Sequence, residues 1–341
     1  THVIRHANKI FALEEAHLPW IIDDDLNTIG CHDFKGLLKG PMTAHPRVCP
    51  ETDELLFFGY SMMSKPYLMY YRVSPKGELI QSEEIDLPRP VMMHDWNITR
   101  NYVVFMDLPL VFDMDSAVRG DDPFGFKPEY GARLGVMPRN GSSKDIKWIN
   151  INPCFVFHPM NAYENDNKII LHVCRQDKAM VGGMDEIYGG DETTGKLWKW
   201  TIDLERQSCS EEQIDDVACD FARVDDRKIG LKADNGYVME LNNKAETLTF
   251  GNNLYKYDLN NGSREDHFLG DYVVGGEPLF APNPDSKYEN DGFVMSIVHD
   301  NKTNKSKLIL IDSCNFEDKP IAEIILPQRV PFGAHGSWLE N

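Results

Sequence analysis

Residues 155–164 have the sequence Phe-Val-Phe-His-Pro-Met-Asn-Ala-Tyr-Glu. A short apolar run ends at His158, the chain turns at Pro159, and a carboxylate, Glu164, closes the stretch. This pattern predicts a buried strand that delivers an imidazole to its end, with a carboxylate near enough to orient the ring. Metal-binding histidines usually have such a carboxylate on their other ring nitrogen, because it fixes the tautomer and raises the basicity of the ring. The stretch therefore predicts a β-strand that carries a metal ligand.

Three other stretches place a histidine in a comparable context, beside small residues, a proline or an aspartate. They are residues 42–46 (Met-Thr-Ala-His-Pro), 92–96 (Met-Met-His-Asp-Trp) and 331–338 (Pro-Phe-Gly-Ala-His-Gly-Ser-Trp). Each histidine lies at an expected strand end or turn, where small neighbours allow close approach to a shared centre. We therefore expect four histidines to meet at one metal ion: His45, His94, His158 and His335.

The remaining histidines have different surroundings. Five lie in polar or terminal contexts typical of the surface: His2, His6, His17, His32 and His267. Two lie within or at the end of strand-like runs, where core or edge histidines are expected: His172 and His299. The four proposed ligands obey no local spacing rule, so hydrogen-bonded structural histidines remain the alternative. If they bind a metal, ligation by imidazoles alone suits Fe, Cu, Ni or Zn.

Carboxylates that could orient these imidazoles occur in four places: Glu15, Glu164, Asp220 and Glu277. Taken singly, each also fits a solvated or turn residue. The four carboxylates become candidates only because the histidines need such partners.

Short β-like runs bounded by turn residues recur along the whole chain. They are residues 9–13, 55–60, 67–73, 102–106, 168–173, 197–202, 254–259, 293–298, 307–311 and 324–326. Helix signals are almost absent, so the chain is predicted to be all-β, either a sandwich or a radial repeat. Histidines spread over the full length favour a propeller, whose strands converge on an axis. No linker divides residues 1–341, and two irregular segments, 120–131 and 176–195, are expected to cover one face.

Composition narrows the function class. The formal net charge of −19 argues against a nucleic-acid partner. The 7 cysteines are odd in number and contain no Cys-x-x-Cys, which favours a reducing compartment. No apolar run approaches the roughly 18 residues of a membrane span. The chain begins at Thr1, so we expect the native N-terminus, with any targeting segment, to be missing.

The motifs, in this order, resemble those of the carotenoid cleavage oxygenase family, from about Asn8 to the C-terminus. They are TAHP at 43–46, MMHDWNIT at 92–99, FHPMNAYE at 157–164, GGEPLF at 275–280, DGFVMSIVHD at 291–300 and LPQRVPFGAHGSW at 326–338. The resemblance implies a seven-bladed β-propeller with one non-haem Fe(II) on its axis and a loop and helix cap over one face. By motif, the iron ligands, and hence the catalytic centre, would be His45, His94, His158 and His335.

The resemblance also implies that three carboxylates orient three of the ligands: Glu15, Asp220 and Glu277. The middle position is often Glu in the family, so Asp220 is a shorter arm. Stilbene-cleaving members tend to have Lys just before the first carboxylate. Glu14 stands there in this chain, which counts against a phenolic stilbene.

Family members carry a substantial segment upstream of the region around Glu15. It supplies the first propeller strands and part of an apolar lid that touches membranes. We therefore expect residues 1–341 to form one N-terminally truncated propeller domain with an incomplete first blade. An unclosed blade would leave an exposed sheet edge.

The implied function is a dioxygenase that splits one C=C bond of a carotenoid or apocarotenoid with O₂ into two carbonyl products. The substrate would lie in an apolar tunnel whose candidate lining residues fit the propeller core equally well: Trp96, Phe105, Phe112, Phe157, Phe332 and Trp338. The alternatives are cleavage of a stilbene or other olefin, another reaction at the same metal, or a non-catalytic binder of apolar ligands. The implied location is the cytoplasm or a plastid, with peripheral membrane contact for substrate uptake.

Overall fold

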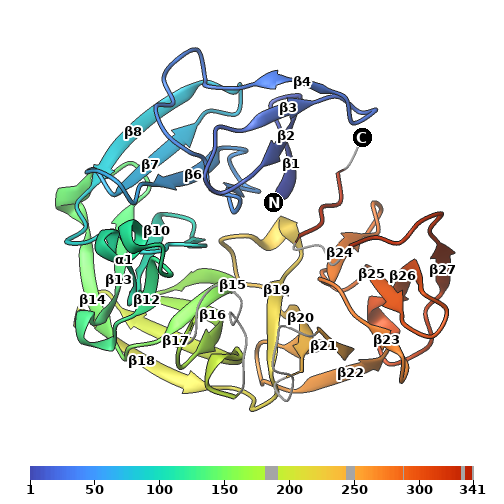
Figure 1. Cartoon of the computed structure of the whole chain (residues 1–341). Helices are drawn as coiled ribbons and strands as arrows, with labels where there is room; N and C mark the ends of the chain where they lie inside the picture. Colours follow the sequence, from blue (N-terminus) through green and yellow to red (C-terminus); the bar gives the residue numbers. More distant parts are fainter. Residues whose placement is uncertain (181–190, 243–249, 287, 332–334, 340–341) are drawn as a thin grey trace.

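The computed structural model describes residues 1–180, 191–242, 250–286, 288–331 and 335–339. Within these ranges the chain forms six antiparallel sheets of four or five strands and one small two-stranded sheet. Figure 1 shows the six larger sheets arranged around a common centre, one after another along the chain. The chain therefore folds as a β-propeller, and each large sheet is a blade.

The first two blades are made by consecutive strands. They contain β1 (His2–His6), β2 (Lys9–Leu13), β3 (Trp20–Ile22), β4 (Thr28–Cys31), β5 (Arg47–Val48), β6 (Leu55–Tyr60), β7 (Leu68–Val73) and β8 (Leu79–Ile85). The third blade has the order β14-β13-β10-β9. Its strands are β9 (Asn97–Ile98), β10 (Tyr102–Asp107), β13 (Ala132–Pro138) and β14 (Lys147–Ile151).

The small sheet and the one described α-helix are inserted into the third blade. They are β11 (Leu110–Phe112), α1 (Met114–Arg119) and β12 (Phe124–Phe126). Short 3-10 turns occur elsewhere: η1 (Pro128–Tyr130), η2 (Ser143–Asp145), η4 (Asp191–Thr193), η5 (Asp226–Lys228) and η6 (Ser313–Asn315). Among the described residues, no helix is long and apolar enough to cross a membrane.

The last three blades follow in chain order. The fourth and fifth contain β15 (Phe155–Asn165), β16 (Lys168–Gln176), β17 (Lys196–Asp203), β18 (Ser208–Gln213), β19 (Cys219–Arg223), β20 (Asn235–Leu241), β21 (Phe250–Asp258) and β22 (Arg264–Phe268). The sixth contains β23 (Val273–Val274), β24 (Leu279–Pro282), β25 (Gly292–Asp300), β26 (Lys305–Asp312) and β27 (Ala322–Ile325).

The strand predictions are confirmed, since every β-like run of the sequence lies largely within a strand. Two of these runs, 293–298 and 307–311, form the antiparallel pair β25–β26. The expectation of irregular structure at 120–131 is partly wrong, because β12 pairs with β11 there. Most of the other irregular segment, 176–195, lies outside the described residues.

Blades are buried on both faces because neighbouring blades pack against each other. In β6, the four residues 55–58 all have exposed fractions of 0%. A close contact of this kind explains Gly135 in β13: a Cβ built there would lie 2.6 Å from the ring of Trp148 on β14. Any larger residue would push that ring away, so the glycine is required by packing rather than by backbone conformation.

The structure describes six blades, whereas the sequence analysis predicts seven. Figure 1 shows the ring open between the first blade (β1–β4) and the sixth (β23–β27), where the C-terminal segment runs. The all-β propeller is confirmed, but the count of seven is not.

Candidate metal centre

The four histidines predicted to be ligands come from four parts of the ring. His45 lies just before β5, His94 just before β9, and His158 within β15. Each of these strands is the first or last in the order of its sheet, and the three sheets are consecutive along the chain. In Figure 1, β15 and β19 lie near the centre of the ring. His335 differs, because it belongs to a C-terminal segment that forms no strand.

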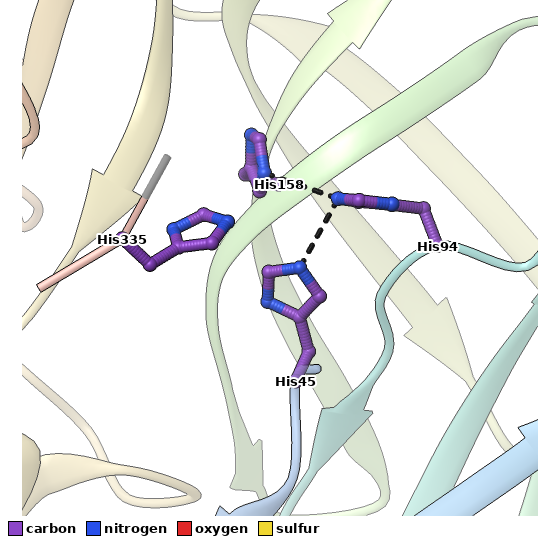
Figure 2. A group of neighbouring side chains, drawn as sticks. All are labelled: His45, His94, His158 and His335. Carbon is purple, nitrogen blue, oxygen red and sulfur yellow. Dashed lines mark hydrogen bonds between the residues drawn. The ribbon is translucent and has the colours of Figure 1, made fainter. Parts of the chain in front are cut away.

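The structure brings the four imidazoles together, with one ring nitrogen from each within 4.8 Å of the others. Figure 2 shows the rings pointing at a shared point. The Nε2 atom of His94 lies 3.1 Å from Nε2 of His45 and 3.3 Å from Nε2 of His158. Two nitrogens that bind one ion at about 2.1 Å, at adjacent corners of its coordination shell, lie about 3 Å apart. The observed spacing therefore fits a shared ion.

Three of the four rings are oriented by carboxylates on the opposite nitrogen. The Nδ1 atoms of these histidines lie within hydrogen-bonding distance of three oxygens: Glu15 Oε2 at 3.0 Å from His94, Asp220 Oδ1 at 3.1 Å from His158, and Glu277 Oε1 at 2.9 Å from His335. A carboxylate accepts, so each Nδ1 donates its hydrogen. In the neutral ring, Nε2 is then left with an unshared lone pair.

This arrangement of lone pairs is the chemical test of the site. Nε2 of His94 and Nε2 of His158 face each other at 3.3 Å, and in the neutral rings neither carries a hydrogen to donate. Two lone pairs at that distance repel, and a cation between them removes the repulsion. The residues present therefore fit a metal ion, which all four imidazoles could hold.

His45 has a different partner. Its Nδ1 lies 3.4 Å from Oδ2 of Asp95, which is itself paired with Arg47 at 2.6 Å. The backbone carbonyl of His45 accepts a hydrogen bond of 2.9 Å from the indole of Trp96. The sequence analysis did not assign Asp95 a role, although its place directly after His94 was a usable signal.

The surroundings shift the pKa values of the proposed ligands in different directions. Burial lowers the pKa of His335 to about 4, although Glu277 opposes the shift. Burial and the neighbouring imidazoles also lower the pKa of His45. Burial would lower the pKa of His94 too, but Glu15 outweighs it and raises the pKa, which makes that ring more basic.

The carboxylate of Glu277, beside His335, is paired with the guanidinium of Arg223. Burial alone would raise the pKa of Glu277, but Arg223 and His335 outweigh it and lower the pKa to about 2. Arg223 lies 3.3 Å from Glu277 through Nη1. Glu277 therefore stays ionised and acts as a permanent acceptor for His335.

Two strands are irregular where they carry the site. The strand end at His158 and the turn at Pro159 predicted from the sequence are wrong, because β15 continues to Asn165; its pairing with β16 instead shifts register around Pro159, directly after His158. The pairing of β19 with β20 shifts after Asp220, where Phe221 adopts a left-handed backbone with φ of 57°. Such bulges re-aim side chains and cluster near functional sites. Here they accompany the contact between His158 and Asp220.

Aromatic rings surround the imidazoles. The ring of Phe157 lies 5.3 Å from that of His94, and Phe221 stacks on His158 at 4.6 Å. Phe250 contacts Phe221 at 5.5 Å. These rings place apolar surface against the imidazoles of His94 and His158, and only Phe157 among them was expected from the sequence.

The other residues expected to line a tunnel lie elsewhere. Trp96 and Phe105 are fully buried in a core cluster, which agrees with the propeller-core alternative for these two residues. Phe112 packs on Phe124 at 5.5 Å, and Phe332 lies outside the described residues. Trp338 is 49% exposed and borders a cavity of about 600 Å³ beside the cluster. That cavity is lined by charged as well as apolar side chains.

Several single-residue expectations need correction. Glu164 orients no imidazole, because it accepts hydrogen bonds from Thr99 and Asn101 instead. His6 and His267, expected at the surface, have exposed fractions of only 3% and 2%. One ring nitrogen of each hydrogen-bonds to a backbone carbonyl, and such a bond offsets the cost of burying a polar imidazole.

The remaining histidines mostly follow the sequence. His172 and His299 are buried as expected. The side chain of His17 is 73% exposed, as predicted. His2 was expected at the surface, but it is partly buried beside the cluster.

The comparison with known families agrees with the site. The model of the retinal pigment epithelial membrane protein family matches residues 1–340. The chain belongs to this family, the carotenoid cleavage oxygenases. The resemblance carried by the histidine motifs is thereby confirmed.

Relatives in this family align with nearly all of the chain. A carotenoid 9,10(9',10')-cleavage dioxygenase of Crocus sativus is 33% identical over the whole chain and 66% of its own length. A carotenoid cleavage oxygenase of Mycobacterium tuberculosis is 30% identical over 99% of the chain and 76% of its own length. The chain thus spans about two thirds to three quarters of these relatives.

A solved structure gives the same result for the fold. The lignostilbene dioxygenase of Pseudomonas brassicacearum superposes with a TM-score of 0.92 and 31% identity, over 100% of this chain and 75% of that one. The propeller and its order of blades are therefore those of the family.

Proposed function

We propose that this chain carries the iron centre of a dioxygenase that cleaves one C=C bond of a carotenoid or apocarotenoid with O₂ to give two carbonyl products. The observation that carries the proposal is the convergence of four imidazoles whose lone pairs face a shared point. The membership of the family supports it, since relatives at 30% to 33% identity are named carotenoid cleavage enzymes.

The proposed ion is one Fe(II) per chain, held by His45, His94, His158 and His335 on the propeller axis. Bound Fe(II) would supply the binding and activation of O₂, which protein side chains cannot provide. Four neutral imidazoles leave the ion its full charge, and ligation by imidazole suits iron.

The chain's own residues orient the imidazoles and place apolar rings beside them. Glu15, Asp220 and Glu277 hold the imidazoles in one tautomer and orientation, which preorganises the site for its ion. Phe157 and Phe221 pack against the imidazoles of His94 and His158, so an apolar polyene would meet apolar surface beside the ion. We assign no general acid or base, because the cleavage of a polyene by O₂ needs none.

Cleavage of a stilbene or a similar conjugated olefin at the same centre is the second candidate. The similarity to a lignostilbene dioxygenase favours it. The position before Glu15 argues against a phenolic substrate, because Glu14 stands there and pairs with His17. A carboxylate repels a phenolate, whereas the lysine of stilbene-cleaving members attracts one.

The proposal is tested with purified protein loaded with Fe(II) under reducing conditions. Loss of polyene absorbance and formation of aldehyde products from a β-apocarotenal, dependent on O₂, is the expected result. Cleavage of a phenolic stilbene in place of the apocarotenal would replace the first candidate with the second. Stoichiometric iron without turnover of either substrate would favour a non-catalytic binder of apolar ligands.

We further propose that the complete propeller has seven blades and that residues 1–341 belong to one such domain. The two faces beside the opening of the ring support this count. On β25, Phe293 and Ile297 are 36% and 46% exposed, and Trp20 of the first blade is 46% exposed. A further blade would bury these apolar side chains. Location in the cytoplasm or a plastid, with peripheral membrane contact, remains our proposal for the cell.

A further inference from the structure

The C-terminal segment carries a proposed ligand without any strand to hold it. Residues 335–339 have no regular structure, so the place of His335 depends on individual contacts. Two of them come from the sixth and fifth blades: the backbone nitrogen of Gly336 donates to Glu277 over 2.8 Å, and Arg223 donates to the carbonyl of Gly336 over 3.1 Å.

The third contact comes from the opposite end of the chain. The hydroxyl of Ser337 lies 3.0 Å from Nε2 of His2, and it also contacts the backbone carbonyl of Val3. Both partners belong to β1. The single hydroxyl hydrogen can go to either acceptor, and in both cases it binds Ser337 to the first blade.

The other nitrogen of His2 reaches a second segment that carries a ligand. Nδ1 lies 3.0 Å from the backbone carbonyl of Ala44, the residue directly before His45. A carbonyl only accepts, so Nδ1 carries the hydrogen. With that hydrogen on Nδ1, the neutral ring presents Nε2 as an acceptor toward the hydroxyl of Ser337.

His2 is therefore close to the cluster without belonging to it. Its ring lies 6.4 Å from that of His45 and 5.7 Å from that of His335. Both of its nitrogens are engaged by protein oxygens, which leaves it no lone pair for an ion. A fifth imidazole in this position has a different purpose from the other four.

We propose that His2 is a positioning residue that ties two ligand-bearing segments, at Ala44 and at Ser337, to β1 and so fixes His45 and His335 relative to each other. This inference rests on the proposed metal site. The two segments belong to different parts of the ring, and without His2 only Val3 would connect Ser337 to β1. Partners that orient metal ligands typically account for about 10- to 100-fold in metal affinity.

The test uses Co(II) as the probe, because its visible absorption reports the number and arrangement of its ligands without any turnover. The parent chain is titrated beside His2→Ala, Ser337→Ala and the double variant. We expect each single variant to bind Co(II) about 10-fold more weakly, with a spectrum shifted toward that of His335→Ala. We expect the loss in the double variant to be smaller than the sum of the two single losses, because both variants remove the contact between His2 and Ser337.

Two further variants separate positioning from general damage. His267→Ala removes another buried imidazole that is bonded to a backbone carbonyl, far along the ring in β22. It is expected to lower the melting temperature without moving the Co(II) spectrum. His2→Asn keeps an amide that can donate to the carbonyl of Ala44, and it is expected to recover part of the lost affinity.

The outcomes are distinguishable. If the parent binds Co(II) and His2→Ala gives the same affinity and spectrum, the positioning role is wrong while the metal site stands. If the single variants show additive losses, His2 and Ser337 act independently and the link is wrong. If the parent does not bind Co(II) at all, the metal site is overturned and the role of His2 with it.

Discussion

His158 and His335 face the same point, yet the chain holds them in different ways. His158 lies within β15, in a blade whose strands are hydrogen-bonded along their length, and its exposed fraction is 5%. His335 lies in a segment without a strand and is held by contacts from Glu277, Arg223 and β1. The comparison indicates that His158 is held by the sheet itself, on what we call the rigid side of the site. His335 is held by side-chain contacts, on what we call the fastened side. We expect the rigid side to survive changes that release the fastened side.

The largest effect is expected from removing a ligand on the rigid side. His158→Ala deletes one of four converging nitrogens in a place that cannot move to compensate. We expect iron to fall from near one per chain to a small fraction of that, measured by metal analysis after loading with Fe(II). His172→Ala is the control, because His172 is also buried in the same blade but lies outside the cluster. Equal iron in the parent and in His158→Ala would remove His158 from the site.

A somewhat smaller effect is expected from Glu277→Ala, on the fastened side. Glu277 accepts from both His335 and the backbone of Gly336, so its loss frees the ligand and its segment together. We expect Fe(II) affinity to fall about 100-fold, the upper end for partners that orient ligands. Limited proteolysis should then cut within residues 335–339 faster than in the parent. A variant that lost affinity but kept the segment protected would contradict this account of the fastened side.

The corresponding change on the rigid side should cost less. Asp220→Ala leaves Nδ1 of His158 unpaired, but β15 still holds the residue in place. We expect a loss of about 10-fold in Fe(II) affinity, the lower end of the same range. Asp220→Asn keeps an oxygen that can accept from Nδ1 and should lose less than Asp220→Ala. If Asp220→Ala cost more than Glu277→Ala, the distinction between the two sides would be reversed.

The smallest effect should come from removing the metal alone. A ligand that binds only the folded state stabilises it by about 2.7 kcal/mol at 100 times its dissociation constant. We expect chelation to lower the melting temperature modestly and to speed hydrogen exchange in residues 335–339, with little change in β15 and β16. Mass spectrometry of peptides from both regions measures the difference. Uniform acceleration in all blades would mean that the ion stabilises the whole propeller rather than the fastened segment.

The sequence by itself determined the strands and the four histidines. Alternating apolar residues fix which face of a strand is buried, so runs such as 293–298 could be located without a structure. The histidine motifs were recognisable because each places an imidazole beside small residues, a proline or an aspartate. The count of seven blades, by contrast, came from the resemblance, and the described residues form six.

Only the tertiary structure decided which partners the imidazoles have. Glu164 is near His158 in sequence, but the bulge at Pro159 and the direction of β15 send it to Thr99 and Asn101 instead. His2 appeared to be a terminal surface residue, because nothing local records that β1 lies beside the C-terminal segment. Contacts between residues so far apart depend on how the blades are arranged around the centre, and a local pattern carries no information about that arrangement.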